Sequence, residues 1–224
     1  MLTEGKFERV LVESRAEFID NAKLKDAVGI VKHLEVAIGL ESSNDAVLKR
    51  CVNKGATYQD YIKAAQEAKG AGAGLRTYLL VKPPFLTEKE AIDDAVNSAR
   101  DASKYSDVIS FNPLNVQKGT TVEKMWKRGE YRPPWLWSVV RIMVESRGLG
   151  PRIVSQPSGG GTERGAHNCG ACDSKILEAL DGFSLTGDYD VFGALDCDCR
   201  ERWRDALELE GFMHTSGDIG RTLE

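Results

Sequence analysis

The chain has 224 residues, of which 42% are hydrophobic and 29% charged, so it is long enough to bury one complete core. Its formal net charge of -4 argues against a uniformly basic nucleic-acid-binding coat, although a local basic patch remains compatible with it. No apolar run approaches the roughly 18 residues that cross a membrane, and the first residues lack a signal-peptide core, so we expect a cytoplasmic protein.

The first half of the chain alternates short apolar runs with amphipathic segments. Residues 7–12 are predicted to form a strand and residues 16–27 a helix. The apolar runs 34–40 and 75–81 are predicted strands, joined by a helix over 57–69. A connection of that length between two buried strands is typical of a parallel crossover.

The same alternation continues further along the chain. A capping box at Thr87 and Glu90 predicts a helix that runs to about residue 103. Residues 107–111 are a predicted strand, Pro134 is suited to begin a helix, and residues 152–155 are the last predicted strand. We therefore expect an α/β protein with a parallel sheet.

Polar residues follow each predicted strand, and the carboxyl ends of parallel strands meet at one edge of a sheet. Hydroxyl, amide and charged groups of this kind suit a ribose, an adenine edge or an amino acid, whereas helix capping explains Ser42 equally well. Glu13 and Arg15 end the first strand, where a surface ion pair is the alternative. The candidate ligand-binding residues are Glu13, Arg15, Glu41, Ser42, Lys82, Asn112 and Asn115.

Four of the five cysteines form two close pairs in the last quarter of the chain. Two pairs of thiolates can supply the four soft ligands of a tetrahedral structural zinc site. We therefore predict a zinc site in which His167 is an alternative ligand, while a redox motif or buried free thiols are the competing interpretations. The predicted ligands are Cys169, Cys172, Cys197 and Cys199.

Basic and aromatic side chains are interleaved between residues 124 and 137. Such a segment can bind folded RNA through phosphate contacts and base stacking. A solvated helix face with core aromatic residues is the alternative. The candidate RNA-binding residues are Lys124, Lys127, Arg128 and Arg132.

Two segments resemble a known family. Residues 39–45 with 48–55, which read GLESSND and LKRCVNKG, resemble the fourth-strand region of radical S-adenosylmethionine enzymes of the elongator-catalytic-subunit type, and residues 13–19 resemble their third strand. The HNCGACD and CDC segments resemble the archaeal family that makes archaeosine in tRNA. The resemblance covers nearly the whole chain but only the C-terminal half of such an enzyme.

This resemblance implies a partial parallel (β/α) barrel over residues 1–160 and a small Cys-rich helical extension, zinc-binding, over 161–224. It also implies that Glu41 and Ser42 lie near the methionine or ribose of S-adenosylmethionine, and that the loops at Lys82 and Asn112 complete the pocket. The implied reaction is a lyase step in the tRNA D-loop, in which a carbon–nitrogen bond of a lysine-bearing 7-deazaguanine is cleaved to leave archaeosine.

Members of this superfamily hold a 4Fe-4S cluster on a C-x-x-x-C-x-x-C loop, and the sequence contains no such triplet. We therefore expect a part of a radical enzyme, whether excised or naturally short, that is inactive by itself. A zinc-stabilised RNA-binding or assembly module without catalysis is the alternative. The expected partners are tRNA, a further tRNA-modification protein and a second copy of the chain, because the first strand would be an exposed edge.

Overall fold

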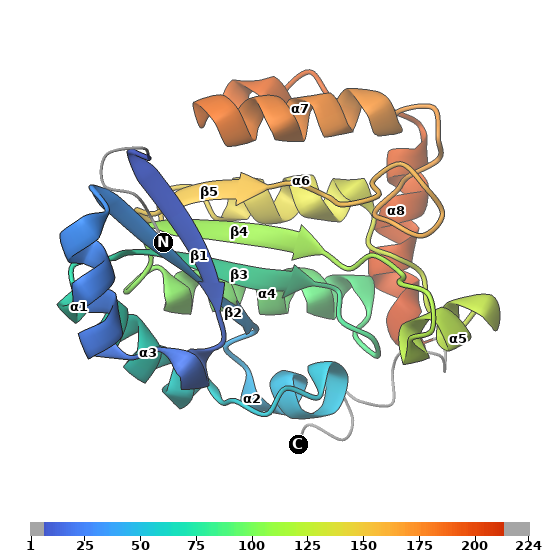
Figure 1. The fold of residues 1–224 in the computed structure, drawn as a ribbon. Coiled ribbons are helices and arrows are strands. Elements are labelled where there is room, and N and C mark those ends of the chain that lie inside the picture. Colours follow the sequence, from blue (N-terminus) through green and yellow to red (C-terminus); the bar gives the residue numbers. More distant parts are fainter. Residues whose placement is uncertain (1–6, 213–224) are drawn as a thin grey trace.

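A computed structural model describes residues 7–212 (Figure 1). Its centre is one sheet of five parallel strands in the order β1-β2-β3-β4-β5, so each strand lies beside its neighbour in the sequence. The strands are β1 Arg9–Ser14, β2 His33–Glu41, β3 Gly74–Val81, β4 Val108–Pro113 and β5 Arg152–Ser155.

Helices connect the strands and follow the last one. The α-helices are α1 Asn21–Ile30, α2 Asp45–Val47, α3 Tyr58–Gly70, α4 Glu88–Ala102, α5 Thr121–Lys127, α6 Leu136–Glu145, α7 Asp173–Thr186 and α8 Cys199–Leu209. Shorter helical turns are η1 Ala16–Phe18, η2 Leu48–Val52, η3 Tyr189–Phe192 and η4 Glu210–Phe212. The capping boxes at Thr57 with Asp60 and at Thr87 with Glu90 begin α3 and α4.

Two helical segments depart from a single regular helix. The predicted helix over 16–27 is wrong at its start, because Ile19 is extended and Asp20 begins a new helix by accepting the backbone N–H of Lys23 at 2.9 Å. The helix after Asn44 has only one regular turn before it widens into the π-helical turn η2. Asn53 ends that turn in the left-handed conformation, with φ 55°.

One face of the sheet packs against α3, α4 and α6, of which α4 and α6 lie behind the strands in Figure 1. Alternate residues of each strand enter this core, as in β3, where Leu75, Leu79 and Val81 are fully buried. The same hydrophobic cluster includes residues of α7 and α8, among them Ile176 and Trp203. The helical extension therefore shares one core with the barrel.

The opposite face, which we call the inner face, carries polar residues and is partly exposed. At one edge of the sheet, Ser184 of α7 donates to the carbonyl of Ser155 and accepts its N–H, so α7 covers β5. At the other edge, Leu11 and Val12 of β1 are 43% and 38% exposed. This arrangement is a partial parallel (β/α) barrel, as predicted. No helix in the described part of the chain is long and apolar enough to span a membrane.

Candidate functional site

The four cysteine sulfurs of the C-terminal extension lie within 4.8 Å of one another. The Sγ–Sγ distances are 3.9 Å between Cys169 and Cys172, 3.7 Å between Cys169 and Cys197, and 3.7 Å between Cys172 and Cys199. A tetrahedral ion with bonds of about 2.3 Å to sulfur places its ligands about 3.8 Å apart. The geometry therefore matches one metal ion, and the prediction that these cysteines form a metal-binding cluster is confirmed.

Helix starts and hydrogen-bond donors hold this cluster in place. Cys172 immediately precedes α7 and Cys199 is the first residue of α8, so a single ion would join two helices. Trp137 donates its indole N–H to Cys199 Sγ at 3.3 Å, and Asn168 donates its amide to Cys172 Sγ at 3.4 Å. Such donors stabilise thiolate charge and orient the ligands.

The thiols differ in how readily they ionise. Burial raises the pKa of Cys172 and of Cys199. For Cys169 burial acts in the same direction, but hydrogen bonds from the backbone N–H groups of Cys172 and Ala171 outweigh it and lower the pKa to about 7. A divalent cation would reverse the preference of the buried thiols for the protonated form, so metal binding here releases protons.

His167 lies outside the four-sulfur group. Its Nδ1 is 2.8 Å from the carbonyl of Gly165, and burial lowers the pKa of its imidazole. The backbone carbonyl of His167 accepts a hydrogen bond from Arg132 at 2.8 Å. His167 thus fixes the chain just before the first cysteine pair and replaces none of the four ligands in this arrangement.

The exit of β2 brings Glu41 onto the inner face and turns Ser42 away from it. Glu41 has φ 70° and pairs with Lys54 at 3.0 Å. Its carboxylate lies over Gly39, where an added Cβ would be only 2.5 Å from Glu41 Oε1, so a larger residue at this position would displace the carboxylate. Ser42 is fully buried and donates to Asp94 of α4 at 2.7 Å.

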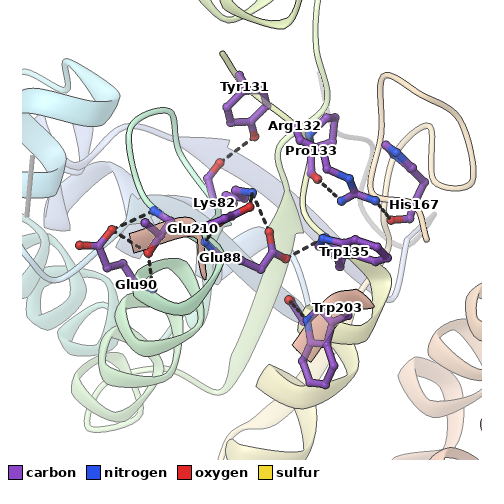
Figure 2. Close-up of polar contacts among 12 residues, drawn as sticks. Lys82, Glu88, Glu90, Tyr131, Arg132, Pro133, Trp135, His167, Trp203 and Glu210 are labelled. Atoms are coloured by element: carbon purple, nitrogen blue, oxygen red, sulfur yellow. Dashed lines mark hydrogen bonds and ion pairs between the residues drawn. The ribbon is translucent and has the colours of Figure 1, made fainter. Parts of the chain in front are cut away.

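The exit of β3 contains a buried ion pair (Figure 2). Lys82 Nζ lies 2.7 Å from Glu88 Oε2, and the two side chains are 5% and 1% exposed. Glu210, which follows α8, lies 3.6 Å from the same ammonium, and Tyr131 donates to the carbonyl of Lys82 at 2.8 Å. Glu88 also accepts the backbone N–H of Trp135 at 2.8 Å. Lys82 therefore joins the starts of α4 and α6 to the end of α8.

The remaining predicted ligand-binding residues lie at the ends of β1 and β4. Asn112 accepts a hydrogen bond from Ser110 at 3.0 Å. Asn115 packs against Gly159, in the glycine-rich turn at residues 158–162 that follows β5. Arg15 pairs with Glu17 at 2.6 Å, so the alternative of a Glu13–Arg15 ion pair is wrong. Glu13 instead accepts from the Tyr78 hydroxyl at 2.9 Å. Contact of the seven predicted residues with a cofactor remains a prediction.

Three inner-face residues were missed from the sequence. Tyr78 of β3 bonds to Glu13 of β1 across the intervening strand β2, and the neighbouring Arg76 donates to Glu35 at 2.7 Å. Burial and the Glu13 hydrogen bond raise the pKa of Tyr78. The alternation of Arg76 and Tyr78 with the apolar residues of the same strand was the available signal, because period-2 alternation marks two different faces of a strand.

The basic segment divides into an outward and an inward part. Three basic residues of α5 and its C-cap are exposed: Lys124, Lys127 and Arg128. Arg132 turns inward, where its guanidinium stacks on Trp135 at 3.9 Å and donates to the carbonyls of Pro133 and His167. Lys127 and Arg128 pair with the nearby Glu123 and Glu130, so an RNA phosphate would have to replace these ion pairs, and RNA binding by this segment remains a prediction.

No family model matches the chain, but curated sequences and solved structures do. The archaeosine synthase subunit beta of Methanosarcina acetivorans is 41% identical over 218 residues, which are 95% of this chain and 63% of that protein. The protein of the same name from Thermococcus kodakarensis is 42% identical over 206 residues, 90% of this chain and 64% of its own length. Elp3 of Methanocaldococcus infernus, solved with an N-terminal deletion, superposes with a TM-score of 0.59 at 19% identity, over 79% of this chain and 41% of that chain.

The five-stranded parallel sheet gives this chain an α/β fold like that of Elp3. Its sequence places it among homologues of archaeosine synthase subunit beta, at about 41% identity over most of its length. It spans just under two thirds of the length of these relatives.

Proposed function

We propose that the chain forms the substrate-facing part of a radical S-adenosylmethionine enzyme that makes archaeosine in tRNA by lyase-type carbon–nitrogen cleavage. The observation that carries the proposal is the polar inner face, with Glu13 bonded to Tyr78 and Glu35 to Arg76, in a homologue of archaeosine synthase subunit beta. This face lies on the opposite side of the sheet from the α3–α4–α6 layer, where a barrel encloses its ligands.

The inner face has the donors and acceptors that S-adenosylmethionine needs. Glu41, Glu13, Asn112 and Asn115 lie at strand ends, and their carboxylate and amide groups suit an ammonium, a ribose or an adenine edge. When bound, the cofactor supplies the radical chemistry, and these residues bind and orient it and exclude water. Ser42 and Lys82 would contribute indirectly, by holding the backbone of the two exits through Asp94 and Glu88.

The cysteine cluster does not fit the 4Fe-4S cluster of such enzymes. Each thiolate of that cluster binds a different iron atom, which spreads the sulfurs more widely than the 3.7 to 3.9 Å found here. We therefore assign Cys169, Cys172, Cys197 and Cys199 to one zinc ion that fixes α7 and α8 to the barrel. A 4Fe-4S cluster would belong to residues other than these in the complete enzyme.

The expected partners follow from the same proposal. Lys124, Lys127 and Arg128 would bind the phosphates of tRNA, whose D-loop carries the modified base. The relatives' designation as a beta subunit supports a second tRNA-modification protein as a partner. The cytoplasm is the expected compartment for these reactions.

Nucleoside analysis of tRNA from an archaeal host that lacks its own beta subunit tests the proposal. A full-length beta subunit that contains this segment should restore archaeosine, whereas Glu13→Gln and Tyr78→Phe in the segment should each lower it at least tenfold. Glu8→Gln is the matched control, because Glu8 is 90% exposed and lies beside the same strand. Full archaeosine levels with both inner-face variants would contradict the assignment of this face to the reaction.

A zinc-stabilised RNA-binding or assembly module is the second candidate. The observation in its favour is the four-cysteine site in a chain that also carries the exposed basic residues of α5. Such a module would bind tRNA and its partner equally well when Glu13 and Tyr78 are replaced. If the full-length subunit restores archaeosine and the inner-face variants remain fully active, this second function is favoured over the first.

A further inference from the structure

The starts of all the strands line one cavity at the amino-terminal end of the sheet, opposite the exit loops. Its volume is about 410 Å³. The first residue of each strand contributes to its wall: Arg9, His33, Gly74, Val108 and Arg152. Because Gly74 has no side chain, the centre of the wall stays open between the two edge strands.

The positively charged side chains that line this cavity outnumber its carboxylates. Arg9, Lys32 and Arg152 all line it, and all three are exposed. Arg152 donates to the neutral carbonyls of Ser184 and Leu185. The nearest carboxylate to Lys32 is that of Glu8, 3.9 Å away with 90% of its side chain exposed, a pairing that contributes little.

The carboxylates of the cavity are already matched by other cations. Glu35 accepts from Arg76 Nε at 2.7 Å. Asp107 pairs with Lys69 at 2.7 Å and accepts the backbone N–H of Leu75 at 2.8 Å. Three positive charges therefore face the cavity without an equal number of available negative charges, in a chain whose formal net charge is -4. An incoming anion would supply the missing charge.

The strand register places the two edge arginines on the inner face. Arg9 is beside His33, two residues before Glu35, and Arg152 is beside Val108, which is beside Arg76. The ion pair of Glu35 and Arg76 joins β2 and β3 on the same face, between the two edge arginines. Guanidinium groups from two sides of one hollow suit a tetrahedral oxyanion, because each can donate two parallel hydrogen bonds.

We infer that this cavity binds a phosphate group, and that the group comes from an RNA backbone. Its three cations are exposed and are spread over separate elements, as in a site for one phosphate of an extended chain. The phosphate site stands independently of the proposed function, whereas RNA as its source rests on that proposal. The site is distinct from α5 and from the strand exits.

Binding of a fluorescent RNA hairpin to the zinc-loaded protein, measured by anisotropy at several salt concentrations, tests this inference. Replacing Arg9, Lys32 and Arg152 by glutamine should weaken binding at least tenfold. It should also reduce the slope of log Kd against log salt by about 0.7 to 0.9 for each phosphate that the variant no longer neutralises. The control replaces three exposed helix or turn lysines by glutamine and should weaken binding less than threefold: Lys49, Lys89 and Lys104.

A second variant and a second ligand complete the test. Arg9→Gln with Lys32→Gln leaves the hydrogen bonds from Arg152 to α7 intact, so a folding defect at Arg152 cannot imitate the effect. Calorimetry with a nucleoside monophosphate identifies a small-molecule source if it binds the wild type and not the double variant. The phosphate site is overturned if the pocket and control variants weaken RNA binding equally and the monophosphate does not bind. Weakened RNA binding without monophosphate binding supports the RNA backbone as the source.

Discussion

Replacing Glu88 by glutamine tests the buried ion pair at the exit of β3. Lys82 and Glu88 are 5% and 1% exposed and lie 2.7 Å apart, so loss of the carboxylate charge leaves a buried ammonium. Breaking such a pair costs about 3 to 5 kcal/mol. Glu210 remains 3.6 Å from the ammonium, and a glutamine can still accept from Trp135, so we expect a value near the lower limit.

The expected loss of about 3 kcal/mol in the free energy of unfolding corresponds to a fall in Tm of about 6 to 12 °C for a chain of this size. Urea denaturation of the zinc-loaded protein, followed by circular dichroism, measures it. Lys104→Met is the matched control, since Lys104 and Asp101 form an ion pair whose side chains are 62% and 38% exposed. That change should cost less than about 1 kcal/mol.

A double variant separates the charge from the packing. Lys82→Met with Glu88→Gln removes both charges, so it should be more stable than either single variant. If Glu88→Gln destabilises no more than Lys104→Met, the pair is not buried as described. If the double variant loses the sum of the two single losses, the interaction between the charges is absent and the reasoning fails.

Three further outcomes are expected. Elemental analysis should find one zinc per chain, and a stoichiometry of zero would exclude the site. Cys197→Ser should lose the zinc while the strands persist. Anaerobic iron–sulfur reconstitution should give no 4Fe-4S spectrum. Burial raises the pKa of Asp94 to about 6, above its unfolded value of about 3.9, so its contribution to stability is present at low pH and lost as the pH rises through about 6. Asp94→Asn should remove that part of the pH dependence, and an unchanged profile by urea titration would refute the assignment. The exposed edge of β1 should cause self-association in analytical ultracentrifugation, which Leu11→Lys should reduce; a concentration-independent monomer would contradict this.

Local patterns alone determined the strands, the parallel sheet and the cysteine cluster. Strands such as residues 75–81 carry apolar residues that can be buried only in a sheet covered on at least one face, and the capping boxes at Thr57 and Thr87 are formed by residues three apart. Two cysteine pairs within a short span can chelate one ion whatever the route of the chain between them. These features depend on neighbours in the sequence, which the sequence displays directly.

The roles of individual polar residues were decided by the tertiary structure. Ser42 and Lys82 follow strands, as ligand-binding residues do, yet their partners Asp94 and Glu88 come from α4 and turn both side chains into the interior. Arg132 resembles its basic neighbours in the sequence, but the carbonyl of His167, 35 positions away, draws it inward. Whether a charge faces solvent, a ligand or a buried partner depends on which distant groups arrive beside it. Strand periodicity constrains the face of a residue, but it does not specify those groups.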